Sequence, residues 1–213
     1  QTDEASQRLE RMVEQRRKTG NAGELQVALR YLAYVRFLQT RRDEALTLLR
    51  EAIGILEKVT AAPIARASHK LALAGGTRDA GLLLLDTGDA AQALRHLDDA
   101  RQRYAGLQGR VSPDHADALV GAGRARLALG RAQEALALFE QADDFWRDFD
   151  ADNRWAGEAA YWLARCYEAL DRHAEAKQAY ARAAKILARS PLPADKRLAR
   201  LARSGALAVR AGL

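Results

Sequence analysis

The chain has 213 residues, of which 48% are hydrophobic and 29% charged, and its 34 Lys and Arg against 28 Asp and Glu give a net charge of +6. Its 46 Ala and 31 Leu far exceed its 18 Val, Ile and Thr, so strand-forming residues are too few for a sheet and an all-α fold is predicted. No run approaches the roughly 20 apolar residues that cross a membrane. The single cysteine excludes an internal disulfide framework. Because the sequence begins at Gln1 with neither Met nor a signal-peptide pattern, we expect a processed chain or a fragment of a longer protein.

The spacing of apolar residues predicts ten helices joined by short turns. In chain order they span residues 3–18, 23–39, 42–59, 64–86, 89–106, 113–129, 131–148, 153–170, 172–189 and 193–210. No linker is long enough to divide them, so a single domain over residues 1–213 is expected.

Four stretches of the sequence share one pattern of small and large residues. A small residue is followed after twelve positions by Ala, after four more by a large apolar residue, and after three more by Ala again. The four columns are Ala33, Gly81, Gly123 and Ala164; Ala45, Ala93, Ala135 and Ala176; Leu49, Leu97, Phe139 and Tyr180; and Ala52, Ala100, Ala142 and Ala183.

Each stretch is interpreted as an antiparallel pair of helices. The last three columns lie on one face of the second helix, and the first small residue lets the two backbones approach. A turn separates the helices at Thr40, Gly88, Gly130 and Asp171, where Gly can end the first helix in a left-handed conformation. One pair leaves an apolar face uncovered, so the pairs are expected to stack.

The columns resemble those of the tetratricopeptide repeat (TPR) over roughly residues 22–190. The Ala residues of the second column stand 48, 42 and 41 residues apart, and the closing proline of the usual 34-residue repeat is absent. Both helices of each pair are therefore expected to be longer than usual, as in the kinesin-light-chain-like branch of the family. The resemblance implies a right-handed α-α superhelix. Its parts would be a capping helix or half repeat (1–21), four repeats (22–62, 63–110, 111–151 and 152–190) and a C-terminal capping helix (191–213).

We find no constellation of residues that predicts catalysis, a cofactor or a metal, so the chain is not expected to be an enzyme. His69, His96, His115 and His173 are scattered, and Cys166 is interpreted as a packed core residue. Asp114 and Asp117 are predicted to cap a helix and to favour its dipole. The acidic pairs Asp98–Asp99 and Asp143–Asp144 are expected on solvated helix faces.

The resemblance implies a concave groove lined by the first helix of each pair. Such a groove would bind a protein or peptide segment that carries acidic and apolar residues. The side chains implied as contacts are Arg30, Tyr34, Arg78, Asp117, Arg124, Glu158, Tyr161, Trp162 and Arg165. The alternative interpretation is that Arg124 and Arg165 form structural ion pairs with Asp117, Glu158 or Asp79. No Asn occupies a groove position, which disfavours the carboxylate clamp of chaperone adaptors.

Two further features have alternative interpretations. The aromatic residues Phe145, Trp146, Phe149 and Trp155 are either a contact surface or, as we favour, packing at a junction between repeats. Residues 189–213 carry six basic residues against Asp195, and this stripe could contact RNA, DNA, acidic lipid, an acidic partner or only solvent. Nucleic acid is disfavoured because the rest of the chain is nearly neutral.

The stretch from Ser112 to Leu187 also resembles the C-terminal repeat regions of bacterial serine/threonine protein kinases. This resemblance implies a docking or sensing module of a larger bacterial signalling protein, located in the cytoplasm or outside it on a membrane anchor. The alternative is a scaffold or ligand-sensing part of a secretion or transcription regulator. The oligomeric state is left open.

Overall fold

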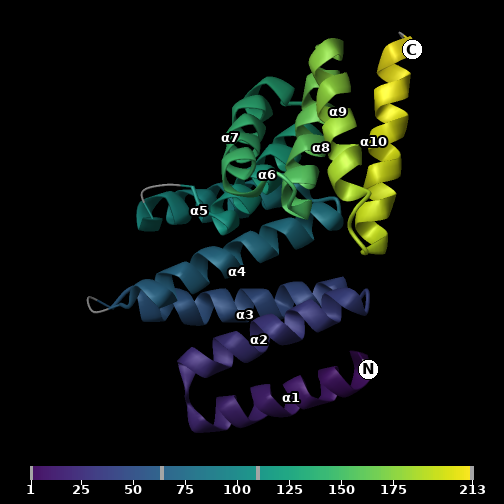
Figure 1. Cartoon of the computed structure of the whole chain (residues 1–213). Helices are drawn as coiled ribbons and strands as arrows, with labels where there is room; N and C mark the ends of the chain where they lie inside the picture. The colour runs from purple at the N-terminus through teal and green to yellow at the C-terminus, as the bar shows by residue number, and fades with distance from the viewer. Residues whose placement is uncertain (1, 63–64, 109–110, 212–213) are drawn as a thin grey trace. The chain divides into compact units, whose positions relative to one another are not determined.

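The computed structural model describes residues 2–62, 65–108 and 111–211, and in these ranges it has ten α-helices and no strand (Figure 1). The all-α prediction is confirmed. The helices are α1 (Thr2–Thr19), α2 (Ala22–Leu38), α3 (Arg42–Thr60), α4 (Ala67–Asp86), α5 (Ala90–Gln108), α6 (Pro113–Ala128), α7 (Ala132–Asp150), α8 (Arg154–Ala169), α9 (His173–Leu187) and α10 (Pro193–Ala211).

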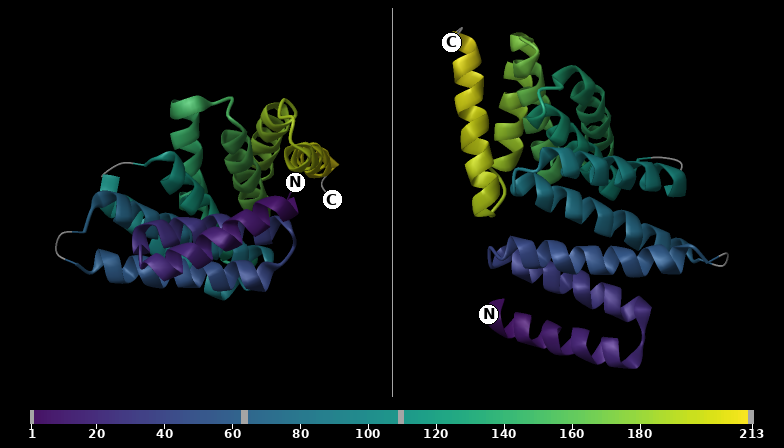
Figure 2. Two further views of the ribbon diagram at one scale, coloured as in Figure 1. Left: turned by 90° about the horizontal axis from the view of Figure 1, so that it is seen from below. Right: turned by 180° about the vertical axis from the view of Figure 1, so that it is seen from behind.

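The chain divides into an N-terminal unit, Gln1–Arg110, and a C-terminal unit, Val111–Leu213. Within each unit every helix packs against the next one in the chain, as both views of Figure 2 show. The first helices of neighbouring pairs also touch: α2 contacts α4, α6 contacts α8, and α8 contacts α10. The stacked helix pairs are therefore confirmed inside each unit, and a single solenoid over the whole chain stays a prediction.

The repeated columns form the cores of the pairs. All eight Ala residues of the second and fourth columns are fully buried, together with the large residues between them. Gly81 and Gly123 must be small, because a Cβ atom there would lie 2.6 Å from Leu97 and 2.7 Å from the Phe139 ring. Contacts below 3.0 Å require the neighbour to move, so the predicted close approach of the two helices is confirmed.

The four turns inside the pairs have the same backbone geometry. Thr40, Gly88, Gly130 and Asp171 all have positive φ, at 62°, 88°, 73° and 57°. In each turn the next residue donates its N–H to a carbonyl five residues back, at 2.8–3.0 Å. This is the Schellman motif, and it satisfies carbonyl groups that the helix end leaves unpaired. The left-handed turn predicted for the glycines is confirmed at Gly88 and Gly130, and Thr40 and Asp171 adopt the same conformation, which was not predicted.

Two details of the helix starts differ from the sequence predictions. Helix α4 begins at Ala67, not at residue 64, and Pro63 lies outside the described residues. Helix α6 is capped by Ser112, whose Oγ accepts the N–H of His115 at 3.2 Å. The capping role predicted for Asp114 and Asp117 is therefore wrong, because Ser112 already stands in the N-cap position before Pro113. Asp114 lies in the first turn, where it favours the helix dipole.

Candidate functional site

Helix α2 of the N-terminal unit carries a row of exposed apolar side chains. Val27, Tyr31, Tyr34 and Leu38 are 41%, 61%, 60% and 51% exposed. They stand at i, i+4, i+7 and i+11, which places them on one face of the helix. The opposite face of α2 is buried in the core of the unit. We call the four residues the α2 stripe; Tyr34 is one of the predicted contacts. Exposed apolar side chains that gather in this way are typical of interaction surfaces.

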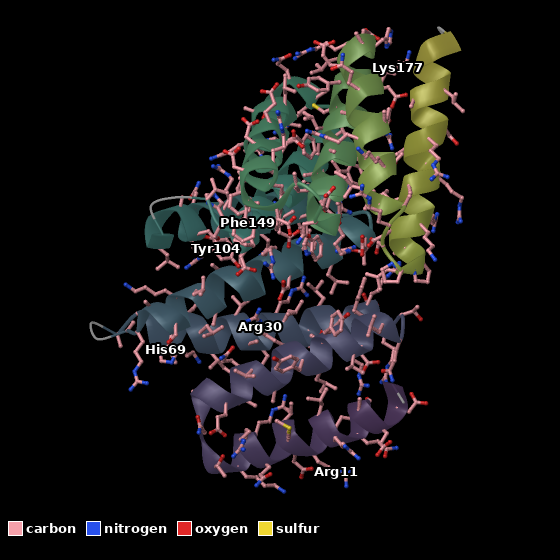
Figure 3. The ribbon with its side chains drawn as sticks, in the orientation of Figure 1. Arg11, Arg30, His69, Tyr104, Phe149 and Lys177 are labelled. Atoms are coloured by element: carbon pink, nitrogen blue, oxygen red, sulfur yellow. The ribbon has the colours of Figure 1, made fainter. Side chains whose placement is uncertain are left out.

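Beside the α2 stripe, two predicted arginines share one carboxylate. Arg30 of α2 reaches Asp79 of α4 with an Nη2–Oδ2 distance of 3.1 Å, and Arg78 approaches the other oxygen of Asp79 at 2.9 Å (Figure 3 labels Arg30). The Arg30 guanidinium lies over the α4 backbone, where a Cβ on Gly75 would be 2.9 Å from it. The glycine therefore makes room for the arginine. These side chains are partly exposed, so the cluster is accessible from solvent.

In the C-terminal unit the predicted site residues contact one another. The Arg124 guanidinium lies 4.8 Å from the centre of the Trp162 ring, and an oxygen of Glu158 lies 3.9 Å from Arg124 Nη1. Arg165 Nε lies 3.5 Å from Glu168 of its own helix. Structural pairing is thus found for Arg124 with Glu158, as the alternative interpretation has it. The partner of Arg165 is an acid that the sequence interpretation did not name.

Tyr161 is buried in the same unit, so its side chain is not accessible to a partner. Its ring packs 5.3 Å from that of Trp162 and 5.9 Å from that of Tyr180. The Tyr180 hydroxyl donates to Glu168 at 2.6 Å, and burial with this bond raises its pKa. A hydrogen bond with Tyr161 is the largest cause that raises the pKa of Arg165. Tyr161 is therefore part of a core cluster.

Asp117 and Glu158 lie at a small hollow on the C-terminal unit, lined by Val120, Trp146 and Trp155 as well. Its volume of about 10 Å³ is too small to hold a side chain of a partner. The two carboxylates therefore contribute to the surface of this unit, and the hollow is not a ligand cavity.

The reactive residues do not converge in the described part of the chain. Residues 2–62, 65–108 and 111–211 hold no group of three or more His, Cys, Asp or Glu that could bind a metal. Cys166 is buried, its thiol donates to the Ala132 carbonyl at 3.2 Å, and burial raises its pKa to about 11. A thiol with this pKa is a poor nucleophile at neutral pH. The interpretation of Cys166 as a core residue is confirmed.

Two profiles of the tetratricopeptide repeat match the sequence, over residues 74–148 and residues 158–186. The chain is built of tetratricopeptide repeats. TPR domains are protein–protein interaction modules. Among curated proteins none is significantly similar in sequence to this TPR chain.

Solved structures share the fold of the TPR chain at low sequence identity. BtubC (BKLC) from P. vanneervenii has a TM-score of 0.72 at 17% identity, over 99% of this chain and 91% of that one. The nearly identical TPR-like repeats of a provisionally assigned kinesin light chain from Podosopora anserina have a TM-score of 0.70 at 22% sequence identity. The match covers 88% of this chain and 87% of that one. The quorum sensor NprR from B. thuringiensis, in its apo form, has a TM-score of 0.57 at 16% sequence identity. The match covers 91% of this chain and 57% of that one. The predicted likeness to long, kinesin-light-chain-like repeats is confirmed at the level of the fold.

Three ion pairs of the TPR chain, each with one buried partner, were missed in the sequence. Asp195 of α10 accepts from Arg154 of α8 at 2.5 and 2.7 Å and from Ser190 at 2.6 Å, and the Arg154 bond is the main cause that lowers its pKa. Arg36 of α2 binds Glu10 of α1. The third pair joins Asp143 to Arg182, so the expectation that both residues of Asp143–Asp144 are solvated is wrong for Asp143. Burial raises the pKa of Asp143 despite its arginine partner.

The aromatic residues near the α7–α8 turn divide between core and surface. Trp146 is buried, and the Phe145 ring stacks on Phe149 at 5.2 Å. Phe149 and Trp155 are exposed, and the Arg154 guanidinium lies 3.9 Å from the centre of the Trp155 ring. The packing interpretation describes Trp146 but not the outer faces of Phe149 and Trp155.

No helix in the described residues of the TPR chain is both long enough and apolar enough to span a membrane.

Proposed function

We propose that this TPR chain is a non-catalytic interaction module that binds protein segments on the first helices of its pairs, with the α2 stripe as the main apolar contact of the N-terminal unit. The exposure of Tyr31 and Tyr34 carries the proposal. Tyrosine gives a large contact area at low entropic cost and is enriched among the residues that dominate binding energy. Tyr31 and Tyr34 lie in line with Val27 and Leu38 and are exposed, so replacing them should change the stability of the fold little. Their side chains are therefore available to contact a partner.

The cluster of Arg30, Arg78 and Asp79 supplies the polar part of the proposed contact. Arg30 has five N–H donors and uses one of them on Asp79, so it can also bind an acidic side chain of the partner. In the C-terminal unit the half-exposed Arg165 and the Arg124–Trp162 pair are the proposed contacts. The segment expected to bind therefore carries apolar side chains for the α2 stripe and acidic side chains beside them.

We propose that the chain is a docking or sensing region of a larger bacterial signalling protein, such as a serine/threonine kinase. The quorum sensor NprR supports only the point that a fold of this kind serves in a sensor. The alternative is a scaffold or sensing part of a secretion or transcription regulator. The parent gene decides between them: an adjoining kinase domain supports the first proposal, and an adjoining DNA-binding domain supports the second.

The α2 stripe is tested with peptides selected from a random display library on the wild-type chain. Their affinities are measured by fluorescence anisotropy for wild type, for Tyr31→Ala with Tyr34→Ala, and for the control Phe149→Ala with Trp155→Ala. Both double variants lose two exposed aromatic rings, and circular dichroism checks that both are folded. We expect the Tyr variant to weaken binding about 10- to 100-fold and the control to bind as wild type does. Unchanged affinity in the Tyr variant would refute the α2 stripe as the binding surface.

A further inference from the structure

Helices α9 and α10 of the C-terminal unit border an open groove at the edge of the hydrophobic cluster that they share. The groove has a volume of about 450 Å³ and is lined by Ala181, Ala184 and Lys185 of α9 and by Arg203, Ala206 and Leu207 of α10. Its floor is therefore made of small apolar side chains, and a cation stands on each rim. The two helices lie side by side in Figure 1 and Figure 2.

The cations around this groove differ from most arginines of the C-terminal unit, which form salt bridges. Lys196, Arg197, Arg200 and Arg203 are all exposed on α10, and within the described residues none of them forms a salt bridge. The carboxylate of Asp195 cannot neutralise them, because it is buried and bound to Arg154 and Ser190. The outer face of α10 is thus cationic without compensation from its own helix.

The sequence register places part of this charge along the groove. Lys196, Arg200, Arg203 and Leu207 stand at i, i+4, i+7 and i+11 and share one face of α10. On α9, Lys177 and Lys185 flank Ala181 at intervals of four residues (Figure 3 labels Lys177). The nearby acid Glu175 is paired with Arg172. Two rows of cations therefore run beside an apolar floor.

The shape of the groove selects the class of partner. A lipid surface is flat and would meet the rims without filling the floor between the helices. Single-stranded nucleic acid stacks its bases on aromatic side chains, and the residues that line the groove include none. A helix can place an apolar row between two helices while its acidic side chains meet cations on both sides.

We propose that the α9–α10 groove is a second docking surface, which takes an acidic amphipathic helix of a partner protein. Apolar side chains of that helix pack on Ala181, Ala184 and Ala206, and its carboxylates pair with Lys185, Arg200 and Arg203. This surface lies entirely in the C-terminal unit, so it does not depend on the α2 stripe or on the function proposed for it.

The probe for this surface is a synthetic helical peptide with Leu and Ala on one face and Glu on the other. Its affinity is measured by fluorescence anisotropy, beside a control peptide in which every Glu is Gln. We expect the Glu peptide to bind at least about tenfold more tightly than the Gln peptide at low salt, and we expect this advantage to shrink between about 50 and 300 mM salt. Equal binding of the two peptides contradicts the proposal.

Two variants of the chain separate the groove from diffuse charge. Lys185→Glu with Arg200→Glu and Arg203→Glu is expected to weaken binding of the Glu peptide at least about tenfold. The matched control, Arg66→Glu with Lys70→Glu and Arg95→Glu, changes the net charge equally at exposed positions of the N-terminal unit and is expected to keep wild-type affinity. Ala181→Trp fills the groove without changing its charge and is also expected to abolish tight binding.

Three further results would overturn the proposal. One is equal loss of binding in the groove variant and its matched control. Another is wild-type affinity in Ala181→Trp, which would mean that charge alone attracts the peptide. The third is binding to phosphatidylserine vesicles or to single-stranded DNA that exceeds binding of the Glu peptide and disappears in the groove variant. Tyr31→Ala with Tyr34→Ala binds the Glu peptide as wild type does, which distinguishes this surface from the α2 stripe.

Discussion

The two units use equivalent repeat positions in opposite ways. Tyr31 of α2 and Trp162 of α8 occupy the same position relative to the small residues Ala33 and Ala164. Tyr31 is among the most exposed aromatic side chains, whereas Trp162 is partly covered by the Arg124 guanidinium. One position earlier, Arg30 reaches out to Asp79 while Tyr161 is buried against Tyr180. The repeat pattern thus fixes where a side chain points but not whether it remains accessible.

The cause of the difference lies in the neighbouring helix. Trp162 is preceded in the stack by another first helix, α6, which supplies Arg124 to cover it. The helix before α2 is α1, which supplies Glu10 to bind Arg36 on another part of α2 and leaves Tyr31 open. A first helix that is covered contributes to stability, and one that is left open is available for binding. Substitutions in a covered first helix and in an open one should therefore have different effects on stability.

The largest effect on folding is expected from truncating Tyr161. Tyr161→Ala removes a buried ring from the cluster with Trp162 and Tyr180 and should lower the free energy of unfolding by about 3–4 kcal/mol. Tyr31→Ala and Tyr34→Ala, which change exposed rings, should remain within about 0.5 kcal/mol of wild type. Urea denaturation followed by circular dichroism measures all three. A loss of similar size for Tyr31→Ala would end the distinction between a covered and an open first helix.

A smaller effect is expected from Asp195→Asn, which breaks the link between α8 and α10. Asn keeps one acceptor oxygen but loses the charge and places an NH2 group against the Arg154 donors, which should cost about 2 kcal/mol at neutral pH, since Arg154 is itself partly exposed. The folded-state pKa of Asp195 is lowered, so its contribution is complete above the unfolded pKa of about 3.9 and is lost as the pH falls through the folded pKa. The denaturation curves of wild type and variant should therefore differ at neutral pH and converge at acidic pH. A difference that does not change with pH would contradict this role.

Asp143→Asn is the matched control for Asp195→Asn. Asp143 is equally buried and is bound by Arg182, but burial raises its pKa above the unfolded value. Its ionised form therefore opposes folding above the unfolded pKa, and this opposition is relieved when the group is protonated at lower pH. Replacement by Asn should cost less than about 1 kcal/mol at neutral pH. A cost as large as that of Asp195→Asn would show that the ion pair outweighs the burial of its carboxylate.

The local pattern of the sequence was enough to predict the helices, the turns and the column of buried Ala. Alignment with Gly88 and Gly130 predicts turns at Thr40 and Asp171, but the left-handed conformation was predicted for the glycines alone, because other residues adopt it only occasionally. The accessibility of the site could not be predicted in this way. Asp195 and Asp143 are buried because Arg154 and Arg182, 41 and 39 residues away, lie beside them in the fold. Tyr34 was expected in the site and is open, whereas Tyr161 was expected there and is buried.

The smallest expected effects concern the turns, and here the two units should respond with opposite signs. Thr40 of the N-terminal unit has φ of 62°, which is costly for a β-branched residue, and Gly130 of the C-terminal unit has φ of 73°. Thr40→Gly should therefore raise the free energy of unfolding by about 0.5–1 kcal/mol, although it gives up the bond from Thr40 Oγ1 to the Gln39 carbonyl. Gly130→Thr, where no atom lies within 4 Å of an added Cβ, should lower it by about the same amount through backbone strain alone. Urea midpoints of the two variants give the sign directly. If Thr40→Gly destabilises the chain, the side-chain bond of Thr40 outweighs the cost of its backbone conformation, and the turns of the two units are not interchangeable.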